Sequence, residues 1–330
     1  MIHTAEFFLY VDISHIRNIE KKKGKMLNLI LAEIESQFSG VTICSVPHKF
    51  RKGSFKINMI VDFIKLLERE DPDITEQDYA EIEWKLNQIA YRMGMPHIDF
   101  FTLNRLDYRF DVRIDDEKVR LYLFQLYQKL FDKYRFQKKN TYSSQTNEHY
   151  KTSLYFNNKS NQTLMYDKEK ERQRRPFEEH EYEKNVLRFE VHTTRKAIYN
   201  NWKRKGIDRT LKNYVTEEMF KYYMNTFVVN IFGKGDFYKC FKSRKLINQS
   251  NEKDAMKKKL IAFLNHISKK GLEGSISKSN EKKGKKVYSN STYKNYKHKL
   301  ELLGIHPIPI PKNKKGIPSK IENPLKALYS

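Results

Sequence analysis

The chain has 330 residues, which is long enough for two domains that each bury a hydrophobic core. Its 64 lysines and arginines outnumber its 40 acidic residues, and the formal charge of +24 exceeds what solubility requires, so we expect a polyanionic partner. Only two cysteines are present, without zinc-site spacing, and no stretch approaches the roughly 20 apolar residues of a membrane span, which argues against disulfide frameworks, structural zinc and membrane proteins.

The basic residues are mixed with aromatic ones. Tyrosine and phenylalanine contribute 21 residues each, whereas a basic disordered tail is poor in rings, so the charge is expected on a folded body. Rings near cations suit single-stranded nucleic acid, because unpaired bases stack on them while lysines contact phosphates. The N-terminus has no basic segment before an apolar run, so we expect a cytoplasmic protein.

The N-terminal part of the chain combines predicted strands with a predicted helix. Residues 6–13 and 54–63 are rich in β-branched and aromatic residues and are expected to be strands, while the segment between them fits no pattern. A helix is expected to start at Thr75 and to end before Pro96, because its apolar residues recur at spacings of three and four. The members of this apolar stripe are Tyr79, Ile82, Leu86, Ile89 and Met93.

A second strand and helix follow. Residues 99–114 form a long strand candidate. The next helix is expected to start at Asp115 or Asp116, because an aspartate side chain accepts hydrogen bonds from the first backbone N–H groups of a helix. Its apolar stripe contains Val119, Leu123, Leu126, Leu130 and Tyr134.

Three further strands are predicted before residue 200. Residues 151–158 and 162–168 are joined by a short polar turn, so we expect a hairpin. The charged segment 169–185 is expected to be a loop with little packing. Residues 186–194 form the last strand candidate.

Helical patterns predominate after residue 200. They cover residues 216–232, 252–270 and 291–305, the last with Thr292 as its cap. Strands followed by helices favour the α+β class, so we expect an antiparallel sheet with helices on one face and a helical C-terminal region. The expected parts are a sheet domain at 1–205, a helical basic region at 206–310 and a flexible, proline-rich tail at 311–330.

Two of the predicted strands share an arrangement of charged residues. Alternate side chains of a strand point to opposite faces, which puts one face of NRLDYRFDV in apolar residues and the other in charged ones. The charged face contains Arg105, Asp107, Arg109 and Asp111. The strand VLRFEVH separates its residues in the same way, with Arg188, Glu190 and His192 on one face.

If the two strands lie side by side, Asp107, Glu190 and His192 converge as oxygen and nitrogen ligands of the kind that bind Mg²⁺ or Mn²⁺. The neighbouring arginines, Arg105, Arg109 and Arg188, are then candidates for contacts with DNA phosphates. The alternative is that both charged faces are simply the solvated side of an antiparallel sheet.

Tyr166 stands at the border between a short apolar segment and a dense run of charges, in TLMYDKEKE. A metal that polarises a phosphodiester makes the phosphorus attackable by a weak nucleophile, and a phenol becomes competent when a cation lies close. Lys168 is two residues further on, and we expect it to supply that cation from the same strand face. The alternatives are that Tyr166 fills a core, or that Tyr155 in the partner strand is the nucleophile.

The order of these motifs, RLDYRFD, then TSLYFNN and TLMYDKEKE, then LRFEVH, resembles the strand-nicking replication initiators of filamentous phages and the related Rep proteins of rolling-circle plasmids. The resemblance covers roughly residues 100–200 well and the remainder more loosely. By position, the family's nucleophilic tyrosine falls on Tyr166 and its neighbouring lysine on Lys168. Its acidic metal ligands fall on Asp107 and Glu190.

Some features of the site go beyond this resemblance or depart from it. His192 is added only because it shares a strand face with Glu190. The broader class of rolling-circle nickases carries a histidine-hydrophobic-histidine pair, which this chain lacks; Glu190-Val191-His192 has that spacing with one ligand changed. Lys170 and Arg172, in the charged run after the tyrosine, are further candidates for DNA phosphate contacts.

The expected function is therefore initiation of rolling-circle replication by Mg²⁺- or Mn²⁺-dependent nicking and rejoining of origin DNA through a 5′-phosphotyrosine. The resemblance implies a host helicase and polymerase as partners. Because no stretch is apolar enough to span a membrane, no membrane partner is expected. A conjugative relaxase is an alternative with the same chemistry. A metal nuclease that uses water is another candidate, and so is a DNA-binding replication or copy-number regulator without catalytic activity.

Overall fold

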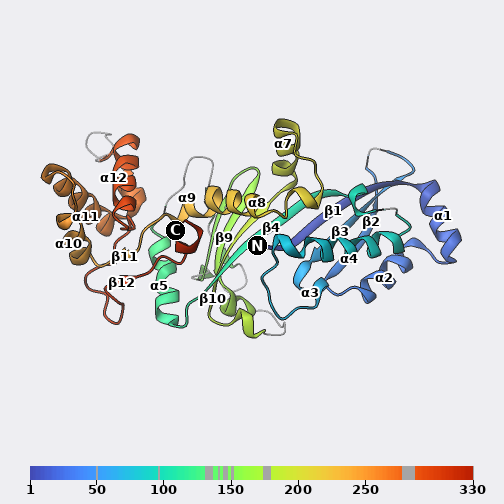
Figure 1. Cartoon of the computed structure of the whole chain (residues 1–330), viewed down its shortest axis with the longest axis horizontal. Coiled ribbons are helices and arrows are strands. Elements are labelled where there is room, and N and C mark those ends of the chain that lie inside the picture. The colour runs from blue at the N-terminus through green and yellow to red at the C-terminus, as the bar shows by residue number, and fades with distance from the viewer. Residues whose placement is uncertain are drawn as a thin grey trace. The chain divides into compact units, whose positions relative to one another are not determined.

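The computed structural model describes residues 1–49, 51–95, 97–130, 152–173, 180–276 and 287–329, together with three short strands at 137–139, 142–143 and 148–149. The fold is α+β, as the sequence predicts (Figure 1). Strands pair in one sheet in the order β2-β3-β1-β4-β10-β9-β8-β5. Their bounds are β1 (Ile2–Asp12), β2 (Val41–Pro47), β3 (Ser54–Asp62), β4 (Thr102–Arg113), β5 (Gln137–Lys139), β8 (Ser153–Asn157), β9 (Asn161–Asp167) and β10 (Val186–Thr193). Two short strands, β6 (Tyr142–Ser143) and β7 (Glu148–His149), pair with each other.

The strand predictions agree with this sheet. The candidates at 6–13, 54–63, 99–114, 151–158, 162–168 and 186–194 correspond to β1, β3, β4, β8, β9 and β10. The hairpin partners β8 and β9 are neighbours, and so are β4 and β10, the two strands with a charged face. The segment without a pattern contains two helices, α1 (Ile13–Lys23) and α2 (Leu27–Gln37), and strand β2.

The chain divides into two compact units that do not follow one another along the sequence. Unit 1 consists of Met1–Phe110, Lys159–Gln162 and Glu190–Tyr223, and unit 2 of Asp111–Asn158, Thr163–Phe189 and Met224–Ser330. Strands β4, β9 and β10 therefore contribute residues to both units. This division differs from the expected boundaries at residues 205 and 310.

Unit 1 is built around the first three strands. The residues of β3 that face inward, Ile57, Met59 and Val61, are completely buried. Figure 1 shows α2, α3 and α4 beside these strands. The helices of this unit besides α1 and α2 are α3 (Phe63–Leu67), α4 (Tyr79–Arg92), α7 (Arg195–Lys205) and α8 (Glu217–Tyr223), with short 3₁₀ turns η1 (Glu76–Asp78), η2 (Ile98–Phe100) and η4 (Leu211–Asn213).

The helix starts follow from side chains that bind backbone N–H groups at the first turn. Before α4, the backbone N–H of Thr75 donates to Asp78 at 2.6 Å, which makes this start a capping box. Asp116, rather than Asp115, caps α5 (Glu117–Tyr127) by accepting from the N–H of Val119 at 3.1 Å. The last helix, α12 (Asn290–Leu302), is capped by Ser289 and not by Thr292, because the Ser289 hydroxyl accepts from the Thr292 N–H.

Unit 2 has a core of aromatic rings. Tyr127 of α5 packs edge-on against Phe232, Phe237 and His306 with ring centroids 5.0 to 6.1 Å apart. Figure 1 shows α10, α11 and α12 lying together in this unit. The remaining elements of unit 2 are α6 (Lys168–Arg172), η3 (Glu181–Glu183), a π-helical turn η5 (Met224–Val229), α9 (Asn230–Phe232), β11 (Phe237–Tyr238), α10 (Cys240–Gln249), α11 (Asp254–Ile276), β12 (Lys320–Ile321) and η6 (Lys326–Leu328).

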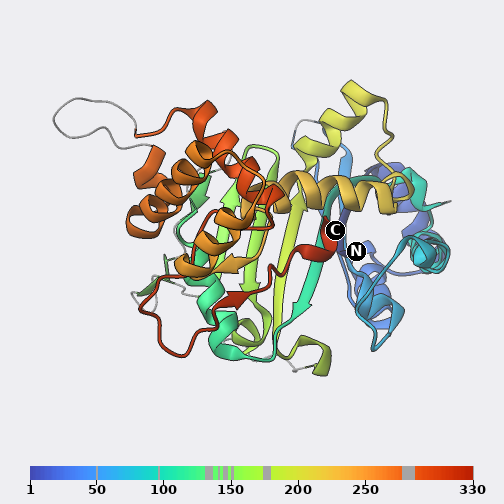
Figure 2. The same ribbon diagram turned by 60° about the vertical axis from the view of Figure 1, so that its left-hand side comes forward.

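Residues 311–330, which we expected to form a flexible tail, contribute to the core of unit 2. Strand β12 pairs with β11, and Figure 2 shows this C-terminal strand beside its partner. Ile321, Asn323 and Leu325 are buried. The apolar residues among the prolines and lysines of this segment supply the packing surface that composition alone did not suggest. No helix in the described part of the chain is both long and apolar enough to cross a bilayer.

Replacing Asn323 tests this role of the C-terminal segment. Its side chain donates to the carbonyl oxygens of Gly233 and Gly235 at 3.1 and 3.0 Å and accepts from the N–H of Leu325 at 2.9 Å. Asn323→Ala leaves these buried groups without that partner, so we expect the free energy of unfolding to fall by about 2–3 kcal/mol. Urea unfolding measures the change. The exposed Asn313 of the same segment is the matched control, and equal values for Asn313→Ala and Asn323→Ala would show that the segment contributes nothing.

Candidate functional site

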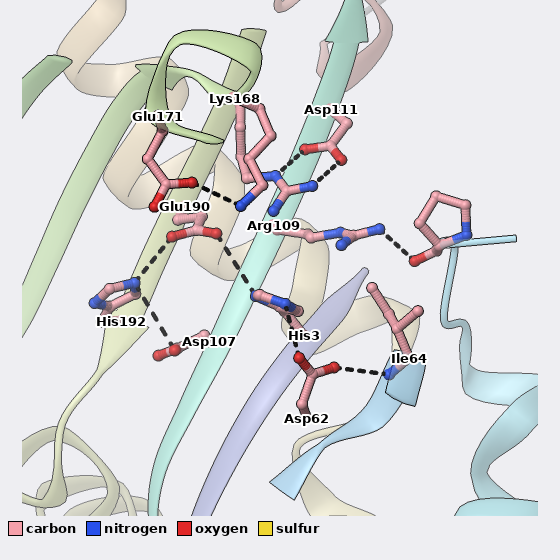
Figure 3. Close-up of polar contacts among 12 residues, drawn as sticks. His3, Asp62, Ile64, Asp107, Arg109, Asp111, Lys168, Glu171, Glu190 and His192 are labelled. Atoms are coloured by element: carbon pink, nitrogen blue, oxygen red, sulfur yellow. Dashed lines mark hydrogen bonds and ion pairs between the residues drawn. The ribbon is translucent and has the colours of Figure 1, made fainter. Parts of the chain in front are cut away.

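Strands β4 and β10 bring three of the predicted metal ligands together within unit 1. The Nε2 atom of His192 lies 3.1 Å from an oxygen of Glu190 and 3.8 Å from an oxygen of Asp107 (Figure 3). The residues come from neighbouring strands and point to the same side of the sheet, as the alternation of the two motifs predicts. We call Asp107, Glu190 and His192 the acid–histidine cluster.

The cluster is buried, so the alternative that these are merely solvated faces is wrong. Asp107 is 3% exposed and Glu190 is 5% exposed. A buried carboxylate is costly unless a positive group or several hydrogen-bond donors face it. Arg105 supplies two N–H donors to Asp107, at 2.8 and 2.6 Å, and its third bond, of 3.0 Å, goes to Glu6.

Burial and neighbouring charges shift the pKa values in the cluster. Burial raises the pKa of Asp107 to about 6, although His192 and Arg105 both act against that rise. Burial by itself lowers the pKa of His192, but the hydrogen bond to Glu190 and the charge of Asp107 outweigh it, so the pKa lies above its ordinary value. The rise at Asp107 therefore comes from burial, and the neighbouring positive groups favour its charged form.

His192 holds a defined orientation. The Nη2 atom of Arg105 lies 3.4 Å from its Nδ1 atom, and its Nε2 atom lies 3.1 Å from Glu190. The Nε2 atom, which lies between the two carboxylates, is the one placed to bind a metal ion. Binding there requires Nε2 to be free of a proton.

Sequence reasoning missed His3 and Asp62, which lie beside the cluster in unit 1. The Nδ1 atom of His3 is 3.7 Å from Glu190, and its Nε2 atom is 3.8 Å from Asp62 (Figure 3). His3 belongs to β1, which pairs with β4, and Asp62 ends β3. The pairing of β1 with β4 shifts register twice, between Ile2 and Ala5 and between Glu6 and Phe7, so strict alternation cannot place His3.

Tyr166 lies near the end of β9, in the part of that strand that belongs to unit 2. Its neighbour Met165 is completely buried, whereas Tyr166 is only partly buried, so the ring is not sealed in the core. Tyr155 of β8 is partly buried as well, so exposure alone does not decide between the two tyrosines. What distinguishes Tyr166 in the sequence is the lysine and the acids that follow it.

Lys168 is near Tyr166, but it does not lie on the strand as predicted. Asp167 ends β9 and caps α6 by accepting from the N–H of Lys170 at 3.1 Å, so Lys168 is the first residue of a helix. The Lys168 Nζ atom lies 5.9 Å from the centre of the Tyr166 ring. It is also 2.8 Å from Glu171 (Figure 3) and 3.4 Å from Glu183. The cation is thus close to the phenol and held by two acids.

Arg120 fixes the segment that follows Tyr166. Its guanidinium is buried and donates to Asp167 at 2.7 Å and to Glu169 at 2.8 Å. Two further bonds reach the carbonyl of Ile114 at 2.7 Å and the side chain of Asn185 at 3.0 Å. The apolar stripe of α5 gave no sign of this role, which depends on partners far away in the sequence.

The predicted DNA-binding residues are all engaged in ion pairs or buried contacts. Arg109 and Arg188 are only 2% and 1% exposed. Arg109 donates to the carbonyl of Pro72, and Arg188 makes two bonds to Asp111 at 2.7 and 2.8 Å. These two arginines make internal contacts instead of facing the solvent, because their strands lie in the middle of the sheet.

Three of these residues remain partly accessible. Arg105 pairs with Asp107 and Glu6 and has a side chain that is 33% exposed. Lys170 pairs with Glu117 at 2.8 Å, and Arg172 makes two bonds to Glu183 at 2.6 and 2.7 Å. Contact of any of these with DNA requires a phosphate oxygen to compete with a carboxylate.

A second group of possible metal ligands lies elsewhere in unit 1. Among the described residues, Glu83, His97 and Asp99 have ligand atoms that all lie within 4.8 Å of one another. Asp107 and Glu190 lie farther apart than this, on either side of His192, so binding of one ion would draw them closer. Both ring nitrogens of His97 already have partners, namely the Asn87 amide at 2.9 Å and the Asp99 N–H at 3.2 Å. His97 and Asp99 are 40% and 54% exposed, which is typical of a surface turn without an ion.

Comparison with known proteins adds no family to this geometry. No protein-family model matches the chain, and no curated protein matches its sequence. The residues of the two units are therefore the basis for assigning a function.

Removing Arg120 tests whether it holds the segment that carries Tyr166. Arg120→Ala leaves the buried carboxylate of Asp167 without its partner, so we expect the free energy of unfolding to fall by about 3–5 kcal/mol. Arg113→Ala is the control, because that arginine is 62% exposed and pairs with Asp115 on the surface, where ion pairs contribute less than about 1 kcal/mol. Urea denaturation measures both. A loss for Arg120→Ala no greater than that for the control would contradict this role.

The ion pairs of Glu183 predict a dependence of stability on pH. Burial by itself raises its pKa, but the hydrogen bond from Arg172 and the charge of Lys168 outweigh burial, so the pKa lies below the ordinary value of 4.5. The stability that this carboxylate contributes is therefore complete above pH 4.5 and is lost as the pH falls through its lowered pKa. We expect Glu183→Gln to destabilise the protein by roughly 3 kcal/mol at neutral pH and by progressively less in acid, as the wild-type group takes up its proton.

Urea unfolding of both proteins from neutral pH down to about pH 3 measures this convergence. Glu181→Gln is the control, since Glu181 is exposed and pairs with Lys184 at the surface. A difference between wild type and Glu183→Gln that stays constant over the whole range would contradict the assigned ion pairs.

Proposed function

We propose that the protein is a metal-dependent enzyme that nicks one strand of origin DNA and rejoins it, and so starts rolling-circle replication. The observation that carries this proposal is the pair of buried carboxylates, Asp107 and Glu190, with His192 between them on neighbouring strands. Buried acids with a histidine nitrogen fit Mg²⁺ or Mn²⁺ by the chemistry of their donor atoms.

Asp107, Glu190 and His192 would hold the ion. When bound, it would draw electron density from a phosphate oxygen and so make the phosphorus more readily attacked. Arg105 favours the charged form of Asp107 and holds that side chain in position through two hydrogen bonds. Glu190 and His192 orient one another through their hydrogen bond, which leaves the Nε2 atom directed at the carboxylates.

Tyr166 is the proposed nucleophile. Its phenol oxygen would form a bond to phosphorus while the bond from phosphorus to the 3′ oxygen of the preceding nucleotide breaks. The phenol proton goes to solvent, and the leaving oxygen takes up a proton to become a 3′ hydroxyl that primes synthesis. Lys168, whose amine lies 5.9 Å from the centre of the ring, would supply the positive charge that favours the phenolate. Attack by a 3′ hydroxyl on the phosphotyrosine reverses the bond changes and rejoins the strand.

The charge of the chain supports DNA as the substrate. A net charge of +24 on a folded body attracts a polyanion, and contacts with phosphates position a duplex without reading its sequence. Exposed aromatic residues are available for unpaired bases, among them Tyr199 and Trp202, which are 41% and 42% exposed. The host helicase and polymerase belong to this proposal as partners that continue synthesis from the nick.

Replacing the phenol by a phenyl ring tests the proposal. Supercoiled DNA that carries the replication origin is incubated with the protein and Mg²⁺ or Mn²⁺, and denaturing electrophoresis reveals protein attached to a 5′ end. We expect Tyr166→Phe to lose the adduct and at least roughly a thousandfold of the nicking rate, because the attacking oxygen is absent, while binding to the DNA is kept.

Tyr155→Phe is the matched control and should retain both cleavage and the adduct. Cleavage by Tyr166→Phe at the wild-type rate without any adduct would indicate a nuclease that uses water. If the wild-type protein binds the DNA but never cuts it, the protein is a regulator and the proposed reaction is wrong. Loss of the adduct in Tyr155→Phe instead would move the nucleophile to that residue.

A further inference from the structure

His3 stands at the edge of the acid–histidine cluster with each ring nitrogen directed at a different carboxylate (Figure 3). Its Nδ1 atom faces Glu190 at 3.7 Å, and its Nε2 atom faces Asp62 at 3.8 Å. The side chain is 22% exposed, so it neither fills the core nor points fully into solvent. Neither distance is short enough for a hydrogen bond.

Taken in pairs, these distances agree with the spacing of ligands around an ion. No three ligand atoms of His3, Asp107, Glu190 and His192 lie within 4.8 Å of one another, so binding of one ion would draw them together. Two donor atoms that each lie about 2.1 Å from one ion are roughly 3–4 Å apart. The Nδ1 atom of His3 stands at such a distance from Glu190, which in turn is 3.1 Å from His192. Glu190 is therefore the common neighbour of two imidazoles, one on β1 and one on β10.

Asp62 has the geometry of a group that orients a histidine ligand. One of its oxygens, Oδ1, accepts from the N–H groups of Ile64 and Lys65 at 3.1 and 3.3 Å and so caps α3. The other oxygen, Oδ2, faces His3. Histidines that bind metals commonly direct their second ring nitrogen at a carboxylate, which fixes the tautomer and the orientation of the ring. Because α3 anchors Asp62, this carboxylate is in place before any ion binds.

We propose that His3 is an additional ligand of the metal site formed by Asp107, Glu190 and His192, with Asp62 as its orienting group, and that this second imidazole makes the site prefer Mn²⁺ to Mg²⁺. The inference rests on the proposed metal site and adds a ligand and a selectivity to it. Carboxylate oxygens suit both ions, whereas imidazole nitrogen suits transition metals better than Mg²⁺. Each imidazole at the site therefore increases the preference for Mn²⁺.

Mn²⁺ binding to the complete chain, freed of metal with EDTA and then dialysed, tests this inference. The paramagnetic resonance signal of free Mn²⁺ during a titration gives the affinity, and displacement by Mg²⁺ gives the preference. We expect His3→Ala to weaken Mn²⁺ binding at least about tenfold and Mg²⁺ binding much less. Asp62→Asn should weaken Mn²⁺ binding about tenfold, because asparagine still caps α3 but no longer carries the charge that faces His3.

Two comparisons make the result specific. His97→Ala removes the histidine of the other candidate cluster and should leave Mn²⁺ binding unchanged. Glu190→Gln should abolish it, since that carboxylate lies between the two imidazoles. Unfolding by urea in EDTA shows whether each variant is folded. If His3→Ala does not fold, Asp62→Asn is used to test the inference.

The outcomes separate the inference from the proposed function. Unchanged Mn²⁺ affinity in folded His3→Ala, or in Asp62→Asn if His3→Ala does not fold, together with loss of binding in Glu190→Gln, overturns the role of His3 and leaves the metal site standing. Loss of binding in His97→Ala alone, or no binding by the wild-type protein, overturns the inference as well. If His3→Ala behaves as expected but wild-type protein forms no adduct through Tyr166, the metal site is retained and strand nicking is not.

Discussion

The structure of unit 1 depends on how it accommodates two carboxylates that its sheet removes from water. Asp107 and Glu190 lie on neighbouring strands, and both are almost completely buried. Such a pair is tolerated only where positive groups surround it. Arg105 and His192 supply that charge in the cluster, and His3 approaches from the adjacent strand. The need to compensate this charge explains why so many ionisable side chains converge in the middle of the sheet.

Unit 2 also compensates a buried carboxylate, but with a buried arginine instead of an arginine and a histidine. There the buried acid is Asp167, and the guanidinium of Arg120 donates to four protein oxygens, one of them on that acid. The same aspartate ends β9 and starts α6, so it brings the phenol of Tyr166 and the amine of Lys168 to the same turn. Unit 1 thus contains the acid–histidine cluster, and unit 2 contains Tyr166 with the amine of Lys168 5.9 Å from the centre of its ring.

The features that depend only on the alternation of a strand or the spacing of a helix could be predicted from the sequence. Strand alternation correctly places Asp107, Glu190 and His192 on one side of two neighbouring strands. The stripe of α4 is buried from Ile82 to Met93, whereas Tyr79 at its start is only partly buried. His3 was not predictable, because two register shifts in the pairing of β1 with β4 break the alternation. Lys168 was assigned to a strand because the capping role of Asp167 is not visible in a pattern of apolar residues. The burial of Arg120 follows from partners 47, 49 and 65 residues away, which no local pattern contains.

The residues of the two units alternate along the sequence, which affects how the chain folds during synthesis. Neither unit is a continuous stretch, since unit 1 needs residues up to 223 and unit 2 begins at 111. A ribosome that releases the chain from its N-terminus therefore cannot complete one unit before making much of the other. Contacts of high sequence separation slow folding, because loop closure must precede the interactions that reward it. We expect the segment that ends with β3 to remain only partly folded, with β1 and β3 paired, until β10 is synthesised and pairs with β4.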